Sequence, residues 1–221
     1  QSNWMPWRLP MKPRGRRTFL HSSSPANRQK TMTDVLKPYN DAAGSEKIIS
    51  DTQLWLERAV IGLNLCPFAK SVFVKKQIRY ALTAANTADE LLAELECELN
   101  LLANTDPSQL DTTLLIHPQA MTDFLDYHFF LAEVDALLRN LDYEGVFQIA
   151  SLHPQYEFAS SDPDDIANYT NRSPYPTLHL LRESSIDRAV AAFPDAANIF
   201  ERNIETMENM GHEGWKKLWL V

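Results

Sequence analysis

The sequence predicts an α/β protein with a small four-stranded sheet, largely parallel, and helices packed on it. Strand-like segments alternate with helical ones at residues 77–83, 112–116 and 146–152, and a last strand is expected at 177–183. Such alternation is typical of right-handed parallel crossovers. No repeat of solenoid period is present. A ferredoxin-like α+β arrangement is the main alternative.

The first half of the pattern begins with a helix from about residue 45 to 64, whose apolar residues form a wide helical stripe. Pro67 ends this helix, because the residue before a proline is pushed out of the α region. The strand at 77–83 follows. Thr87 then opens a second helix, since Glu90 lies three residues later, as in a capping box.

The second half continues in the same order. Thr122 is expected to cap a third helix that reaches about residue 141. After the third strand comes a long polar loop of about residues 155–176, with one helical turn near residues 164–169. From Ser185 onward the chain is predicted to be helical, in one or more pieces.

Charge is unevenly distributed along the 221 residues, whose net charge is −8. Residues 1–33 contain seven Lys or Arg and no Asp or Glu. This basic segment has three interpretations: sequence upstream of a native start at Met32, an organelle transit peptide, or an arm that binds nucleic acid. Because it lacks periodic apolar residues, we expect residues 1–44 to be a disordered extension and residues 45–221 to be a single globular domain.

Composition limits the expected partners and location. The acidic body argues against nucleic acid as the main partner, because phosphate binding needs a cationic surface. No window approaches the ~20 apolar residues that span a bilayer, so no membrane partner is expected. Two cysteines are too few for a disulfide scaffold and favour a reducing compartment. We therefore expect a cytoplasmic protein, or an organellar one if residues 1–31 are a transit peptide.

Two predicted strands end in the same dipeptide, His-Pro, at His117 and His153. If these strands are parallel, both imidazoles lie on one rim of the sheet, where the ligands of open α/β sheets bind. Each proline would stop the strand ladder, so that the imidazole is presented rather than buried. The alternative is that His-Pro is simply a strand terminator.

The loop at 155–176 is a second candidate feature, because loops longer than ~12–15 residues without secondary structure are often functional. Arg172 offers a planar guanidinium to a carboxylate or phosphate, and Asn171 precedes it. Tyr156, near the start of the loop, is grouped with these substrate-binding candidates. The alternative for Arg172 is a bond to loop carbonyls or to a nearby aspartate.

The strand at 177–183 carries polar residues among leucines. His179 and Glu183 share one of its faces, and Leu178, Leu180 and Arg182 share the other. A histidine in mid-strand is either hydrogen-bonded within the core or lines a cavity. We expect the cavity, because the polar residues on its face are hard to bury without partners. A nearby carboxylate would raise the histidine pKa or fix its tautomer.

Cys66 closes the first predicted helix, in the run GLNLCPFAK. A helix C-terminus raises a thiol pKa because the local dipole is negative, so an adjacent histidine would be needed to activate it. The alternative is a small buried hydrophobe. No CxxC, HExxH, GxSxG or phosphate-binding glycine loop is present to decide between them.

Three long strings carry a family resemblance: WLERAVIGLNLCPFAK, TTLLIHP and FQIASLHPQYEFASSDPDDIANYTNRSPYPTLHLLRE. They resemble the bacterial-type family called domain of unknown function 1415, over roughly residues 46–190. The resemblance implies one compact domain and a native start at Met32, and it transfers no reaction. The positions that match the family motif are Asn64, Cys66, Pro67, His153, Pro154, Tyr156, Phe158, Asn168, Asn171, Arg172, Pro174, Pro176, His179, Arg182 and Glu183.

Three functional hypotheses follow. The first is an enzyme that acts on a small polar or anionic metabolite. Its candidate catalytic residues are His153, His179, Glu183 and Cys66. Its candidate substrate-binding residues are Arg172, Asn171, Tyr156 and Arg182. The second hypothesis is a metal-binding protein that uses Cys66 and the histidines, and the third is a non-catalytic module that presents the loop 155–176 to a partner. No motif assigns a cofactor or an oligomeric state.

Overall fold

The fold is that of a computed structural model, which describes residues 42–159, 161–192 and 198–219. The prediction for residues 1–44 therefore lies mostly outside the described residues. The first described helix, α2 (Ala42–Trp55), begins three residues before the expected start and continues into a short π-helix, η1 (Leu56–Ile61). Among the described residues, no helix is long and apolar enough to cross a bilayer.

The sheet contains four strands in the order β1-β2-β4-β3. These are β1 (Ile78–Leu82), β2 (Thr112–Ile116), β3 (Phe147–Leu152) and β4 (Thr177–Arg182). β1 and β2 are parallel, whereas β4 runs antiparallel to both of its neighbours, β2 and β3. The expectation of a largely parallel sheet is therefore wrong, and so is the ferredoxin-like alternative, whose strands and helices follow the order β-α-β-β-α-β.

The connection between β3 and β4 explains the antiparallel strand. A parallel return needs a crossover, usually a helix, that brings the chain back to the opposite end of the sheet. This connection contains only a short 3₁₀ helix, η2 (Ile166–Thr170), at the place where one helical turn was expected. β4 therefore starts at the end of the sheet where β3 finished and runs back between β3 and β2.

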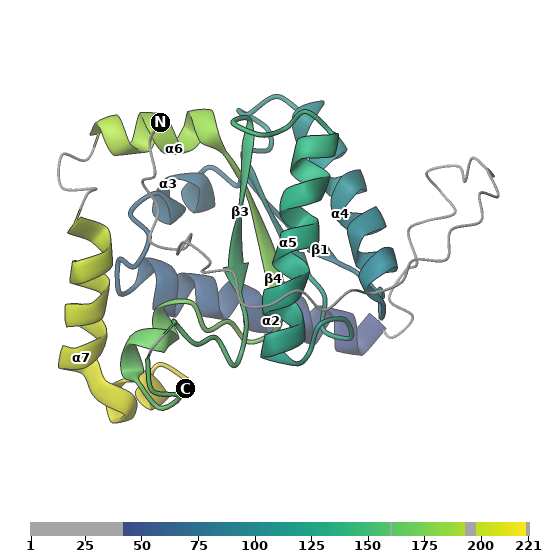
Figure 1. Ribbon diagram of the computed structural model, residues 1–221. Coiled ribbons are helices and arrows are strands. Elements are labelled where there is room, and N and C mark those ends of the chain that lie inside the picture. The colour runs from purple at the N-terminus through teal and green to yellow at the C-terminus, as the bar shows by residue number, and fades with distance from the viewer. Residues whose placement is uncertain (1–41, 160, 193–197, 220–221) are drawn as a thin grey trace.

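Helices cover both faces of the sheet (Figure 1). One face packs on α4 (Ala88–Ala103) and α5 (Phe124–Asn140), through a core that includes Leu115, Leu178 and Leu180. The other face packs on α2, η1, α3 (Ala69–Val74) and α7 (Ile199–Lys217), through a core that includes Leu114 and Leu152. Side chains alternate between the two faces along each strand, as the period of two requires.

Local signals in the sequence account for most element boundaries. Thr87 caps α4 as expected, because its side chain accepts a hydrogen bond from the backbone N–H of Glu90. Helix α5 is capped by Asp123 rather than by Thr122, since the aspartate accepts from two N–H groups of the first turn. β4 ends at Arg182, and Glu183 is the first residue of α6 (Glu183–Ala192).

Candidate functional site

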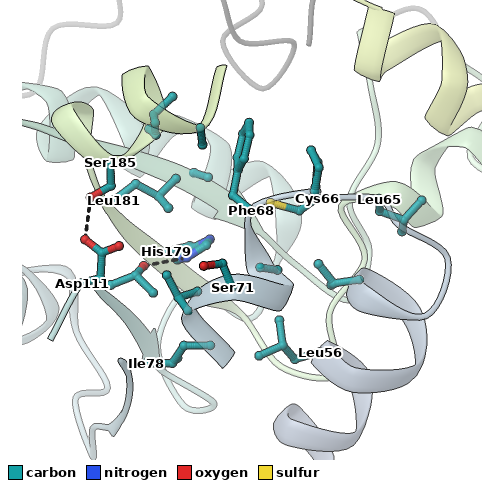
Figure 2. A pocket seen from close by; sticks show the side chains of 18 of the residues that line it. Leu56, Leu65, Cys66, Phe68, Ser71, Ile78, Asp111, His179, Leu181 and Ser185 are labelled. Carbon is teal, nitrogen blue, oxygen red and sulfur yellow. Dashed lines mark hydrogen bonds between the residues drawn. The ribbon is translucent and has the colours of Figure 1, made fainter. Parts of the chain in front are cut away.

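A cavity of about 340 Å³ lies on the face of the sheet that α4 and α5 leave free. Its walls come from α2, η1, the segment around α3, the sheet and α6 (Figure 2). Most of its lining is apolar, including Leu56, Leu65, Phe68, Ile78 and Leu181. This volume is at the small end of the ~300–1,000 Å³ range of ligand pockets, and an apolar wall with a few polar groups is their usual composition.

The segment that follows η1 shapes one wall of this cavity. π-Helical turns are rare and occur often at functional sites. At the end of η1, a Cβ on Gly62 would collide with the carbonyl oxygen of Arg58, so the close turn requires glycine. Asn64 then adopts a left-handed conformation with φ 55°, which asparagine tolerates better than most residues. Together these turns direct Leu65 and Cys66 toward the cavity.

His179 is the imidazole that faces the cavity, from the middle of β4 (Figure 2). Its Nε2 lies 2.8 Å from the hydroxyl oxygen of Thr112 on the neighbouring strand. That hydroxyl donates its single hydrogen to the carbonyl oxygen of Leu180, at 2.6 Å. The hydroxyl must therefore accept from His179, which assigns the proton to Nε2 and leaves a lone pair on Nδ1.

Burial lowers the pKa of His179 from 6.5 to about 4. The imidazole is therefore neutral at neutral pH, which agrees with the tautomer that Thr112 requires. The result is a fixed ring with one nitrogen held by the strand and the other available as a hydrogen-bond acceptor. Ser71, on α3, points its hydroxyl into the same end of the cavity (Figure 2).

A second polar group closes the cavity near the start of β2. The hydroxyl of Ser185, in the first turn of α6, donates to Asp111 at 2.5 Å (Figure 2). The guanidinium of Arg182 stands 3.8 Å from the same carboxylate. Because Asp111 is buried, this pairing with Ser185 and Arg182 compensates part of the cost of holding its charge away from water.

Arg182 is a structural residue rather than a substrate clamp. Its Nη2 donates to the backbone carbonyls of Leu102, Thr105 and Leu110, so it ties the end of α4 and the following loop to β4. The guanidinium also lies over the ring of Phe147, 5.7 Å from its centroid. Although the residue borders the cavity, Nη2 is directed to carbonyls of α4 and the loop that follows it, and Nε has no hydrogen-bond partner within the described part of the chain.

Cys66 lines the cavity, but its chemistry differs from that of an activated nucleophile. Burial raises the pKa of its thiol, and the backbone N–H groups of Phe68 and Ala69 oppose that rise only in part. The thiol lies at the start of α3 as well as after η1, so the expected influence of a helix C-terminus is not the dominant one. At neutral pH the side chain is a protonated thiol in the cavity wall.

His153 does not join His179. The carboxyl ends of β2 and β3 do lie on the same rim, as expected, but an aromatic cluster fills that rim. His153 packs against Phe124 and Tyr127, with ring centroids 5.4 and 5.2 Å apart. Its Nδ1 accepts from the N–H of Gln155, and its Nε2 lies 3.2 Å from the carbonyl oxygen of Met121.

The other members of this aromatic cluster are also packed away from solvent, although Nε2 of His117 has no hydrogen-bond partner among the described residues. His117 is fully buried, stacks on Tyr127, and uses Nδ1 to donate to the carbonyl oxygen of Ala120. Tyr127 donates to the carbonyl oxygen of Thr177 and accepts from the N–H of Leu152. Tyr156 is buried against Phe124, and its phenol contacts the side chains of Ser151 and Asn171. The interpretation of each His-Pro imidazole as presented to a ligand is therefore wrong.

Arg172 and Asn171 hold the long loop together. Arg172 donates to the carbonyl oxygens of Tyr156 and Pro163 and lies over the ring of Tyr169, 4.2 Å from its centroid. This arrangement is the alternative foreseen from the sequence, and it removes the expected anion clamp. Asn171 is fully buried; it borders the cavity and donates to the carbonyl oxygen of Ser151.

The structure thus brings together four of the eight predicted site residues. His179, Cys66, Asn171 and Arg182 border the cavity, whereas His153, Tyr156, Arg172 and Glu183 do not. Glu183 begins α6, so the expected pairing with His179 along one strand is not formed. Sequence reasoning missed Thr112, Asp111 and Ser185. Asp111 and Thr112 are polar residues where a buried strand begins, which is a signal, but Ser185 in the first turn of α6 has none, and neither position reveals its partner.

The described lining of the cavity does not provide the ligands of a metal centre. Within the described ranges, no group of three or more His, Cys, Asp or Glu side chains could hold a metal ion. Cys66 and His179 border the cavity, but His153 lies in the aromatic cluster on the rim. The hypothesis of a site formed by Cys66 and the histidines is therefore not supported by their positions.

Fold and cavity together define a mixed α/β protein with a small, mainly apolar cavity beside its sheet. The chain belongs to the family described as protein of unknown function, DUF1415, which it matches over residues 47–217. This match confirms the resemblance inferred from the sequence and extends it through α7. Neither a curated protein nor a solved structure matches the chain significantly.

Proposed function

We propose that this protein is an enzyme that binds a small organic metabolite in the cavity and uses His179 to accept or share a proton with it. The observation that carries the proposal is the open Nδ1 of a neutral imidazole whose Nε2 is fixed by Thr112. An imidazole held in one tautomer within an apolar cavity is pre-organised for this task. The cytoplasmic location expected from the sequence belongs to the same proposal.

The chemistry follows from the low pKa of His179. With a pKa of about 4, the imidazole is a weak base and stays unprotonated throughout the physiological range. It therefore acts first as a hydrogen-bond acceptor that orients the substrate. When charge develops on the substrate, Nδ1 takes the proton, and the Nε2–H bond to Thr112 holds the resulting imidazolium in place.

The other two hypotheses gain less support from the structure. A module that presents the loop 155–176 would need its side chains directed outward. Arg172 instead bonds within the loop, and α7 packs on η2 through the ring of Trp215, 5.3 Å from that of Tyr169. The metal hypothesis lacks a cluster of ligands within the described residues.

A retention experiment tests the proposal. The purified protein is incubated with a cell metabolite extract, separated from unbound molecules by gel filtration, and denatured so that retained compounds are identified by mass spectrometry. Ala189, on α6, borders the cavity, and Ala189→Trp should fill it. Asp187 is exposed on the same helix and away from the cavity, so Asp187→Trp is the matched control.

The wild type and Asp187→Trp should retain a common compound that Ala189→Trp loses. His179→Gln should abolish or strongly slow any conversion of that compound, because glutamine offers no base. Equal retention by Ala189→Trp, or no compound enriched by the wild type, would contradict the proposal.

A further inference from the structure

The charged side chains around the cavity determine whether it can bind a charged ligand. Its described lining includes three cationic side chains, Lys75, Arg182 and Arg188. Arg182 is committed through Nη2 to three backbone carbonyls, and its Nε, which has no hydrogen-bond partner among the described residues, lies 3.8 Å from the Asp111 carboxylate, which offsets its charge. Lys75 and Arg188 are exposed, and Arg188 bonds to the hydroxyl of Ser185 at 2.9 Å. No buried, uncommitted cation therefore faces the cavity from its described lining.

The remaining titratable groups oppose an anion. Asp111 is buried and carries a negative charge at one end of the cavity. His179 is neutral at neutral pH because its burial among the cavity walls lowers its pKa to about 4, and the hydroxyl of Thr112 holds the remaining proton on Nε2. A buried anion needs a paired charge or several donors to replace its hydration. The apolar side chains that make up most of the wall offer neither.

The polar end of the cavity contains a hydrogen-bond acceptor that needs a donor from a ligand. Nδ1 of His179 has no hydrogen-bond partner among the described residues, and the ring borders the cavity. The hydroxyl of Ser71 points into the same end of the cavity but is not hydrogen-bonded to Nδ1, so a ligand that donates a hydrogen bond would satisfy this lone pair. A site built around one such polar contact rejects analogues that lack the matching group.

On the basis of the proposed function, we infer that the substrate is an uncharged, mainly apolar molecule with one hydroxyl or N–H group that donates to Nδ1 of His179. This assignment replaces the anionic metabolite expected from the sequence. The volume of about 340 Å³ is about twice that of a cavity that holds one benzene ring, so it limits the apolar body to about two rings or a branched chain of similar size.

Three probe molecules of similar size distinguish the effect of ligand charge from the effect of a hydrogen-bond donor. p-Cresol is uncharged and donates a hydrogen bond, toluene is uncharged without a donor, and benzoate is an anion. Binding is measured by calorimetry and by the shift in Tm. Occupancy of the cavity is measured independently as protection of Cys66 from alkylation by N-ethylmaleimide, followed by peptide mass spectrometry, with Cys97 outside the cavity as internal control.

p-Cresol should bind at least about tenfold more tightly than benzoate, because the anion would lose hydration without gaining a charged partner. It should bind about three- to tenfold more tightly than toluene, since one hydrogen bond is gained. At ten times its Kd it should raise Tm by about 3–6 °C, and it should slow alkylation of Cys66 but not of Cys97.

Two variants of His179 test the contact itself. In His179→Gln the terminal amide reaches the Nε2 position and keeps a partner for Thr112, but nothing replaces Nδ1. In His179→Asn the amide lies near the Nδ1 position and can offer its oxygen as the acceptor. The advantage of p-cresol over toluene should disappear in the glutamine variant and be restored, at least in part, in the asparagine variant.

Several results would overturn the inference. Benzoate binding as tightly as p-cresol, with protection of Cys66, would show that the cavity accepts anions. That result would leave the proposed function standing. Failure of p-cresol to protect Cys66 at millimolar concentration would also overturn the substrate class. The retention experiment with Ala189→Trp decides separately whether the cavity binds a metabolite at all.

Discussion

The protein places histidines in two regions that differ in whether an unused ring nitrogen borders a cavity. On the rim beyond β2 and β3, His153 bonds through both nitrogens within a cluster of aromatic rings. On the cavity face, His179 bonds through Nε2 and leaves Nδ1 available. What distinguishes the candidate functional imidazole is an unused ring nitrogen that borders a cavity, because Nε2 of His117 on the rim is also unused but is sealed in packing. The dipeptide that surrounds the histidine does not distinguish them.

The same contrast applies to the arginines. The sequence predicted that Arg182 and Arg172 bind the substrate. In the structure, both donate hydrogen bonds to backbone carbonyls instead. Carbonyls at the end of a helix or within a long loop lack strand or helix partners, and a guanidinium satisfies several of them at once. Substitution of the structural histidines and arginines should lower the stability of the protein and leave ligand binding unchanged. Substitution of His179 should instead alter ligand binding.

The largest expected effect is on His153. His153→Ala should lower the free energy of unfolding by about 3–5 kcal/mol, because it removes a buried ring from the aromatic cluster and leaves two backbone groups without partners. Denaturant unfolding measures the change. His128 is exposed on α5, so His128→Ala is the control, with an effect within about 0.5 kcal/mol. A loss below about 1 kcal/mol for His153→Ala would mean that this histidine is not a core residue.

Arg182→Met should destabilise the protein by about 2–4 kcal/mol. The substitution keeps an apolar side chain of similar length over Phe147, but it deprives three carbonyls of their donor and Asp111 of its nearest cation. Arg139→Met, at an exposed position of α5, is the matched control. If Arg182→Met unfolds like the control but weakens p-cresol binding, the structural interpretation of Arg182 is wrong.

The free energy of unfolding should depend on pH in the acidic range, because His117 is buried in its neutral form. Burial lowers the pKa of His117 from 6.5 to about 4, so the unfolded chain binds a proton in this range that the folded chain does not. The contribution of His117 is fully present above pH 6.5 and is lost as the pH falls toward 4, by about 3 kcal/mol.

Because carboxylates also titrate in that window, the informative quantity is the difference between the wild type and His117→Asn. Asparagine can keep the donor to the carbonyl oxygen of Ala120 and does not titrate. The variant should lose less stability between pH 6.5 and 4 than the wild type does. Parallel stability curves would show that His117 titrates normally.

The smallest expected effect is on Arg172. Arg172→Ala should cost about 1 kcal/mol, because the side chain is only partly buried and its two carbonyl partners can bond to water instead. The loop 155–176 should become more sensitive to limited proteolysis. The affinity for p-cresol should stay unchanged. A tenfold loss of affinity would show that Arg172 contributes to ligand binding after all.

Local sequence signals predicted the strands and the capping of α4 closely, because each depends on a few neighbouring residues. The direction of β4 was not predicted, since it depends on how a long connection returns to the sheet. The alternation of β4 did place His179 opposite Leu178 and Leu180, on the face that proved to have a cavity. Its partner Thr112 lies 67 residues away, and no local pattern joins the two.

The most direct test of the account is an NMR titration of His179 with ¹⁵N-labelled imidazole. The account predicts a neutral Nε2–H tautomer that persists as the pH falls until about 4, with the Nδ1 resonance shifting when p-cresol binds. A pKa near 6.5, or a proton on Nδ1 in the neutral state, would contradict it.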